Sequence, residues 1–204
     1  MRIFCVGRNY VEHIEELKNE RPDEPVIFTK PDTALIRNNN PFYYPEFSKD
    51  IHHEVELVLR ISKEGKNIDE KFALKYFDSI GIGIDFTARD IQQKAKTKGL
   101  PWDIAKGFNG SAPVSDKFID VSEIHDLTNI NFKLEVNGAL KQKGNTSLML
   151  FSFGSIISYL SKFFTLKTGD LIFTGTPKGV GPVSPGDKLS AYIENEKMLE
   201  FEVR

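Results

Sequence analysis

The feature of this sequence that most restricts its fold is an alternation of side chains between residues 52 and 61. Apolar Val55, Leu57, Leu59 and Ile61 alternate there with Glu54, Glu56, Val58 and Arg60. A period of two residues predicts a β-strand with one face packed in a core. The opposite face then carries Glu54 and Glu56, with backbones roughly 7 Å apart. Because like charges repel, this face must either meet solvent or hold a cation between its carboxylates.

Several further segments have strand signals, and few have helix signals. The sequence predicts strands at 1–6, 26–30, 79–86, 130–136, 170–174 and 188–194, and helices at 9–20, 68–77 and 153–164. The helix at 153–164 carries the apolar stripe Phe153, Ile156, Ile157, Leu160 and Phe164. Asn137-Gly138 predicts a hairpin turn. Many short strands with few helices indicate a mixed, β-rich α+β domain.

Length and composition narrow the class of protein. A chain of 204 residues fits a single domain over residues 1–204, with no linker or repeat. Its 27 basic and 29 acidic residues give a net charge of −2, which argues against a nucleic-acid partner. The uncharged stretch 144–161 contains many polar residues, so we expect no membrane span. A single cysteine, Cys5, excludes an internal disulfide and fits a cytoplasmic protein.

A third carboxylate follows the apolar strand predicted at 79–86. Asp85 stands there, and with Glu54 and Glu56 it makes three oxygen donors, which would suit a hard cation such as Mg²⁺. The alternative for the two glutamates is a solvated polar edge. His52 shares their face and could be a further ligand, although a single strand histidine is more often a structural hydrogen-bond partner.

Two loops contain residues of interest. Residues 98–113 combine Trp102 and Lys106 with several glycines and prolines, and such loops often line sites. By itself, Lys106 is typical of a surface lysine. Residues 175–182 are either a rigid turn or a nest of backbone N–H groups that, with the Thr176 hydroxyl, could hold a substrate carboxylate. The second loop does not match a P-loop.

Taken in order, these segments resemble the fumarylacetoacetate hydrolase family, in its short single-domain branch of acylpyruvases and oxaloacetate decarboxylases. The matching segments are Gly7–Tyr10 with His13 and Glu16, Phe28–Pro31, His52–Leu57, Asp85–Gln92, Lys98–Lys106, Gly144–Thr146 and Thr174–Pro182. They span essentially the whole chain. The resemblance implies a β roll with a pseudo-barrel core, similar to the family's C-terminal domain, and a homodimer.

The resemblance also implies roles for individual residues. The implied ligands of Mg²⁺ or Mn²⁺ are Glu54, Glu56 and Asp85, and the implied substrate-binding residues are Arg89, Gln92 and Thr176. The substrate would be a small 2-oxo acid whose carboxylate and 2-oxo group chelate the ion. Lys106 would stand beside the substrate oxygens. His13 and Glu16, three residues apart on the helix at 9–20, would form a base and its orienting partner on a lid.

These roles imply an acylpyruvate hydrolase. His13 would activate water for attack on the acyl carbonyl, and Lys106 and the ion would stabilise the pyruvate enolate that leaves. The same enolate would arise from oxaloacetate by loss of CO₂. One alternative is an isomerase or decarboxylase of 2-hydroxy-dienoates from aromatic degradation, which needs no attacking water and therefore no His13 and Glu16. A second alternative is a non-enzymatic binding module that a metal ion stabilises.

Overall fold

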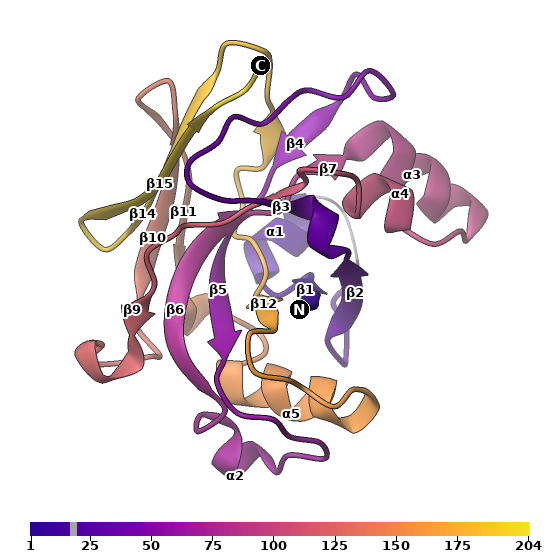
Figure 1. Ribbon diagram of the computed structural model, residues 1–204. Coiled ribbons are helices and arrows are strands. Elements are labelled where there is room, and N and C mark those ends of the chain that lie inside the picture. Colours follow the sequence, from indigo (N-terminus) through magenta and orange to yellow (C-terminus); the bar gives the residue numbers. More distant parts are fainter. Residues whose placement is uncertain (17–19) are drawn as a thin grey trace.

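Short β-strands make up most of the regular structure in the computed structural model, which describes residues 1–16 and 20–204 (Figure 1). The strands are β1 (Ile3–Gly7), β2 (Val26–Lys30), β3 (Leu35–Ile36), β4 (Ile51–His53), β5 (Val55–Ile61), β6 (Phe77–Ile84), β7 (Thr87–Ala88), β8 (Ala112–Pro113), β9 (Ile119–Asp120), β10 (Asn131–Val136), β11 (Ala139–Asn145), β12 (Leu171–Phe173), β13 (Gly181–Pro182), β14 (Lys188–Ile193) and β15 (Glu196–Glu202). The α-helices are α1 (Val11–Glu16), α2 (Glu70–Ala73), α3 (Arg89–Lys98), α4 (Asp103–Lys106) and α5 (Phe153–Phe163). Single 3-10 turns cover Asp32–Ala34, Val121–Glu123 and Thr146–Leu148.

The strands form one large and three smaller sheets. The largest has six strands in the order β2-β1-β12-β5-β6-β9, in which β1 and β12 are parallel and the other neighbours are antiparallel. The smaller sheets are β11-β10-β14-β15, β13-β4-β7 and β3-β8. Within the described residues no sheet closes on itself, so the expected pseudo-barrel core consists of open sheets. The expected mixed, β-rich α+β fold is confirmed.

Both faces of the six-stranded sheet are covered. Leu57 on β5 is fully buried in the larger apolar cluster, which includes the inner residues of the four-stranded sheet. Val58 points the other way and is fully buried in a second cluster together with Phe173. The face of β5 that carries Glu54 and Glu56 is therefore enclosed rather than a solvated edge.

Helix α5 covers one end of the large sheet, next to α2 (Figure 1). It begins where the Ser152 hydroxyl accepts a hydrogen bond of 3.1 Å from the Ser155 N–H, which is an N-cap. Of its predicted stripe, Ile156, Ile157 and Leu160 are fully buried. Phe164 is the exception, because it follows the end of the helix and is 36% exposed. The helix thus follows directly from local sequence signals.

The other two predicted helices are shorter than expected. The lid helix expected at 9–20 is represented by α1, which begins two residues late, and Glu20 lies outside it. Residues 17–19 of that prediction lie outside the described residues. The helix expected at 68–77 is limited to α2, because Phe77 already belongs to β6 and pairs with β5.

The strand expected at 52–61 is interrupted at Glu54, which separates β4 from β5. The Val55 N–H donates to the Gln142 side-chain oxygen at 3.0 Å instead of continuing a strand ladder. The Glu54 carbonyl accepts from the Asp85 N–H at 2.8 Å. This break joins three segments of the chain at the point where the acidic residues stand.

Other sequence predictions are confirmed closely. β2 has the predicted limits of 26–30. Asn137 and Gly138 join β10 to β11 with φ angles of 53° and 77°, and a two-residue hairpin turn of this type requires positive φ at both central residues.

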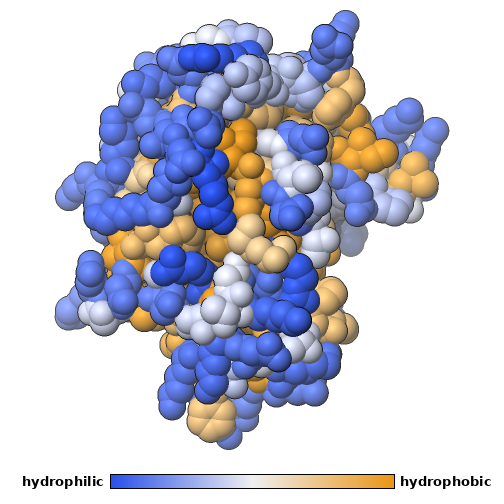
Figure 2. All heavy atoms as spheres, in the orientation of Figure 1, coloured by the Kyte–Doolittle hydropathy of each residue, from blue (hydrophilic) through white to orange (hydrophobic). Residues whose placement is uncertain are grey.

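Hydrophilic residues cover most of the face in Figure 2, and hydrophobic residues gather near its centre and at its right-hand edge. Among the described residues, no helix has the length and apolar character needed to cross a membrane. The expected homodimer stays a prediction.

Gly83 on β6 has protein neighbours where a side chain would stand. A Cβ at this position would lie 2.7 Å from the ring of Phe173 and 3.0 Å from the Pro113 carbonyl oxygen. Gly154 on α5 is different, because its nearest neighbours would lie at 3.6 Å, an ordinary contact distance. The glycine in β6 is therefore a packing requirement of the sheet.

We expect Gly83→Ala to lower the free energy of unfolding by about 1 to 3 kcal/mol, because the added methyl group overpacks the interior. Gly154→Ala is the matched control. It should leave the free energy unchanged or raise it by up to about 1 kcal/mol, since alanine favours a helix. Urea unfolding of the parent and both variants measures these values. Equal midpoints for the two variants would contradict the packing argument.

Candidate active site

Three buried carboxylates converge where β5 and β6 pair. Glu56 lies opposite Gly83 in that pairing, Glu54 precedes β5, and Asp85 follows β6. One carboxylate oxygen from each acid lies within 4.8 Å of the other two, and the three residues are only 4%, 2% and 1% exposed for Glu54, Glu56 and Asp85. The alternative of a solvated polar edge is therefore wrong for these glutamates.

Basic side chains lie against two of these acids. Lys106 Nζ is 2.7 Å from Glu54 Oε2 and 2.8 Å from Asp85 Oδ2, and Arg89 Nη2 is 2.5 Å from Glu54 Oε1. Burial would raise the pKa of Glu54, but the charges of Lys106 and Arg89 outweigh it and hold this pKa well below the usual range. Burial would lower the pKa of Lys106, but Asp85 and Glu54 raise it. Both groups are therefore ionised.

Glu56 is the exception. Its Oε2 accepts a hydrogen bond of 2.6 Å from the Gly175 N–H, and it has no ion pair with any described residue. Burial, together with the charges of Asp85 and Glu54, raises the pKa of Glu56 well above its usual value. An acid in this position is held in a negative environment without its own counterion.

The acid cluster fits a divalent cation. Asp85 Oδ1 has no hydrogen-bond partner within the described part of the chain, although Lys30 Nζ lies 2.8 Å away. A divalent cation among the three acids would supply the charge that Glu56 lacks. Carboxylate oxygens are the donors that Mg²⁺ and Mn²⁺ prefer.

His13 and Glu16 lie on α1, next to the acid cluster. His13 Nδ1 is 3.3 Å from Glu16 Oε2, as their spacing predicted. Burial lowers the pKa of His13 and outweighs the opposing charges of Glu54 and Glu16. The ring is therefore neutral at pH 7, the form that accepts a proton.

The second oxygen of Glu16 attaches α1 to the loop at 175–182. Glu16 Oε1 accepts a hydrogen bond of 3.0 Å from the Gly179 N–H, and Glu12 forms an ion pair of 3.2 Å with Lys178. Residue 179 must be glycine in this loop, because its φ is 95° and a Cβ there would clash with the Lys141 carbonyl. The structure thus shows α1 docked against this loop.

The same loop serves the acid cluster and the cavity. Its Gly175 amide is used by Glu56, so the expected nest of N–H groups is partly occupied by the protein itself. The Thr176 hydroxyl accepts from Gln142 Nε2 at 2.8 Å, and its own proton remains available. Gln142 Oε1 also lies 2.9 Å from His53 Nδ1. These buried amide contacts fix Thr176 in place.

Eight of the nine residues that the sequence and the resemblance proposed line one cavity. Glu16, the ninth, stands behind His13. Arg89 and Gln92 face the cavity from the first turn of α3, where Arg89 Nη1 donates to Gln92 Oε1 at 2.7 Å. The cavity has a volume of about 30 Å³, which leaves space for about one or two water molecules. A substrate can therefore enter only if part of the cavity wall moves. Helix α1, which contributes His13 to that wall, is the segment that we expect to move.

Sequence reasoning missed several residues of this site. Lys30 is fully buried against Asp85 and donates to the Phe86 carbonyl at 3.3 Å, and it lies in a segment that the resemblance had marked. Arg8 and Lys96 also line the cavity. No pattern in the sequence singled out Gln142. Within the described part of the chain, His52 belongs neither to the cavity lining nor to the acid cluster, and its Nε2 lies 2.9 Å from Asp50 Oδ1.

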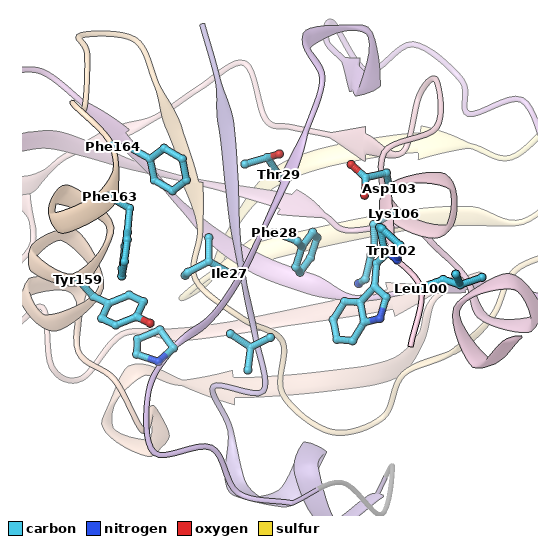
Figure 3. A pocket seen from close by; sticks show the side chains of 13 residues that line it. Ile27, Phe28, Thr29, Leu100, Trp102, Asp103, Lys106, Tyr159, Phe163 and Phe164 are labelled. Atoms are coloured by element: carbon cyan, nitrogen blue, oxygen red, sulfur yellow. The ribbon is translucent and has the colours of Figure 1, made fainter. Parts of the chain in front are cut away.

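A larger groove of about 680 Å³ lies beside the cavity (Figure 3). The end of α5 borders it with Tyr159 and Phe163, and β2 runs through it with Phe28. Phe28, Trp102 and Lys106 also line the small cavity. The rings of Phe28 and Trp102, whose centroids are 6.1 Å apart, separate the two spaces. Apart from Asp103 and Lys106, the described lining of the groove is uncharged, so the acid chemistry belongs to the small cavity.

Comparison with known proteins agrees with this geometry. A family described as "Fumarylacetoacetate (FAA) hydrolase C-terminal" matches residues 2–204, nearly the whole chain. The chain belongs to the fumarylacetoacetate hydrolase family. The resemblance that the sequence motifs indicated is thereby confirmed.

Individual members of the fumarylacetoacetate hydrolase family are similar over almost their full length. A mitochondrial oxaloacetate tautomerase of Bos taurus is 45% identical over 201 residues, which cover 98% of this chain and 90% of the relative. A mitochondrial oxaloacetate decarboxylase of Dictyostelium discoideum is 46% identical over 204 residues, 99% of this chain and 93% of the relative. These relatives identify the chain as an enzyme of the family. Because both are mitochondrial, a cytoplasmic location stays a prediction.

A solved structure of a family member contains a divalent metal ion and a small 2-oxo acid. The structure of fumarylpyruvate hydrolase from Pseudomonas aeruginosa in complex with Mn²⁺ and pyruvate has a TM-score of 0.94 and 34% identity to this chain, covering 100% of it and 89% of that protein. This similarity and the acid cluster together support a divalent metal site. The choice between Mg²⁺ and Mn²⁺ stays open.

We expect Glu56→Gln to abolish stabilisation by a divalent ion. In chelator the variant should melt at the parent's temperature or higher, because an amide replaces a buried acid that has no counterion. Addition of Mn²⁺ should raise the melting temperature of the parent, since a ligand that binds only the folded state stabilises it, but not that of the variant.

Glu64→Gln is the matched control, because Glu64 is exposed and lies in the loop that follows β5, away from the cluster. Its response to Mn²⁺ should equal that of the parent. Thermal unfolding followed by circular dichroism provides the measurement. A full Mn²⁺ response in Glu56→Gln would show that this acid is not a ligand.

Proposed function

We propose that this chain is a divalent-metal-dependent enzyme that cleaves the C–C bond of 3-acylpyruvates, giving a carboxylate and pyruvate, and that decarboxylates oxaloacetate at the same site. The observation that carries the proposal is that His13, backed by Glu16, lines the same buried cavity as the acid cluster and Lys106. The names of the relatives support it, because their reactions share an enol or enolate of a 2-oxo acid.

Glu54, Glu56 and Asp85 would hold the ion. When bound, it supplies a Lewis acid that polarises the 2-oxo group of the substrate. Lys106 adds a positive charge at the same point, because its ammonium group lies within 2.8 Å of both Glu54 and Asp85. A buried, fixed cation of this kind stabilises negative charge on a substrate oxygen without any rearrangement.

Two features of its environment suit His13 to act as a base: its contact with Glu16 and its burial. Glu16 accepts a hydrogen bond from Nδ1–H, which assigns the proton to that nitrogen and leaves the lone pair of Nε2 for catalysis. Burial keeps the ring neutral. The pair therefore has the geometry of a general base with an orienting carboxylate.

Hydrolysis would then proceed by attack of water on the acyl carbonyl, followed by cleavage of the C–C bond. A water oxygen bonds to the acyl carbonyl carbon while a water proton moves to His13 Nε2. The bond between that carbon and C3 of the pyruvate part breaks, and its electron pair moves into the enolate, whose oxygen faces Lys106. His13 returns the proton to C3. The products are one carboxylic acid and pyruvate, with all atoms and charges balanced.

Oxaloacetate tautomerisation is a second candidate function. The bovine relative named for this reaction is 45% identical, and interconversion of the enol and keto forms needs a base that removes and returns a proton at C3, which His13 would supply. Decarboxylation differs, because the bond to the leaving CO₂ breaks without removal of a proton. The three reactions therefore depend on His13 to different extents.

We expect His13→Ala to lower acylpyruvate hydrolysis by about 10²- to 10⁴-fold, the usual effect of losing a general base. Oxaloacetate tautomerisation should fall with it, while decarboxylation should change far less. Hydrolysis is measured as pyruvate release from acetylpyruvate, and decarboxylation as pyruvate release from oxaloacetate. Both assays contain Mg²⁺ and are corrected for the reaction without enzyme.

The absorbance of enol-oxaloacetate measures tautomerisation. His125→Ala, at an exposed histidine outside the cavity, is the control and should behave as the parent. Unchanged hydrolysis in His13→Ala excludes the base assignment. An equal loss of hydrolysis and decarboxylation would assign His13 to substrate binding instead.

The pH profile gives a further expectation. Because burial lowers the pKa of His13 below its ordinary value of about 6.5, the neutral base persists in mildly acidic solution. The acid limb of kcat/KM for hydrolysis should therefore lie below pH 6.5. Below pH 6.5, His13 binds a proton in the unfolded chain but stays neutral in the folded chain. The free energy of unfolding should therefore also decrease as the pH falls through this range. A limb centred above pH 6.5 would contradict a buried neutral base.

A further inference from the structure

Gln142 connects three separate segments of the chain. It lies on β11 and is buried, and it reaches both the start of β5 and the loop that follows β12. Its Oε1 accepts a hydrogen bond of 3.0 Å from the Val55 N–H and lies 2.9 Å from His53 Nδ1. Its Nε2 donates to Thr176 Oγ1 at 2.8 Å and to the Pro177 carbonyl at 2.9 Å. A side-chain amide has two acceptor positions and two donors, so all four are used.

The backbone determines which way the Gln142 amide faces. The Val55 N–H can only donate, so it requires the amide oxygen, and the Pro177 carbonyl can only accept, so it requires the NH₂ group. An amide turned round would place donor against donor and acceptor against acceptor. Because unmade hydrogen bonds are costly in an interior, the backbone contacts leave one orientation for this side chain.

This orientation decides the role of the Thr176 hydroxyl. A hydroxyl has one proton to donate, and a lone pair of Oγ1 is already occupied by a proton of Gln142 Nε2. The Thr176 proton must therefore point away from Gln142. Within the described part of the chain, the Thr176 hydroxyl makes no other hydrogen bond, and the residue lines the small cavity. The cavity is the place where an acceptor for this proton can stand.

The loop that carries Thr176 is held on both sides of this residue. The Gly175 N–H donates to Glu56 Oε2 at 2.6 Å, and the Pro177 carbonyl accepts from Gln142. The ring of Pro177 restricts the backbone further. The Thr176 hydroxyl therefore has a fixed position as well as a fixed polarity, as a pre-organised binding group requires.

We propose that Gln142 is a positioning residue that makes Thr176 a hydrogen-bond donor, so that this point of the cavity selects a ligand oxygen that only accepts, such as a carboxylate oxygen. This inference rests on the proposed function, in which the substrate is a 2-oxo acid. An ionised carboxylate has no proton to donate, whereas a donor group on the ligand would meet the Thr176 proton. A protein donor that is fixed in advance needs no ordering when the ligand binds.

A double-mutant cycle between Gln142 and Thr176 tests the proposal. Thr176→Val removes the donor but keeps the shape, and it should raise KM for acetylpyruvate by about 10- to 100-fold, the range for a hydrogen bond to a charged group. Gln142→Met removes the amide at similar length and should raise KM by about 3- to 30-fold, because the hydroxyl is then free to turn. In both variants kcat should change far less, since this contact is made before and during the reaction alike.

The double variant distinguishes a positioning role from a structural one. If Gln142 acts through Thr176, then Gln142→Met should change KM by no more than about twofold once Thr176→Val is present. Effects that simply multiply would mean that Gln142 only supports the fold, and the proposal would be wrong. A parent-like KM in Gln142→Met would also overturn it. Gln93→Met is the matched control, because Gln93 is exposed on α3, and it should leave KM unchanged.

A spectroscopic measurement covers the case in which Gln142→Met does not fold. The chain has three glutamines, Gln92, Gln93 and Gln142, so ¹⁵N labelling of glutamine gives three side-chain NH₂ signals, and substitution of the first two assigns the third. Saturating pyruvate with Mg²⁺ should shift the Gln142 signal in the parent but not in Thr176→Val, since the ligand acts on the amide through the hydroxyl. No shift in the parent, or an equal shift in Thr176→Val, contradicts the proposal.

A binding measurement keeps this result separate from the proposed function. Calorimetric titration of pyruvate into the Mg²⁺-loaded protein should give the same non-additive cycle in the dissociation constant, whether or not the parent turns over any acylpyruvate. A parent without turnover that shows this cycle would overturn the proposed function alone. An additive cycle, or a parent that does not bind pyruvate, would overturn the role of Gln142.

Discussion

The site depends on the burial of three like charges at one point. Glu54, Glu56 and Asp85 come together because β5 and β6 pair in antiparallel register, and such a cluster is costly in an interior unless positive charge meets it. Lys30 and Lys106 reach it from distant parts of the chain: both pair with Asp85, and Lys106 also pairs with Glu54. The third acid remains without a counterion, and this imbalance makes the cluster receptive to a cation.

The supporting structure consists largely of side-chain amides that bond to backbone. Asn9 joins the turn after β1 to the segments around Phe151 and Thr174, and Gln142 joins the start of β5 to Thr176. Each amide offers both donors and an acceptor, so one side chain can satisfy two or three loops at once. Loops held in this way place charged groups accurately although they belong to no regular element.

Local patterns in the sequence predicted what depends on near neighbours. The alternation from Val55 onward, the turn at Asn137 and the stripe of α5 up to Leu160 each lie within about ten residues, and each is confirmed. The break at Glu54 could not be foreseen, because the amide of Val55 bonds to Gln142, far away in the chain. Lys106 carried no local sign of burial for the same reason: its partners lie 21 and 52 residues away. The resemblance to a family supplied the site residues that local patterns could not.

Glu16 has two carboxylate oxygens, and each has a different task. One is bonded to His13 and the other to the Gly179 amide, so the same side chain orients the ring and fastens helix α1 to its loop. If His13 is the base that we propose, the docking of the helix and the orientation of the base depend on the same carboxylate, so loss of Glu16 would disturb both at once.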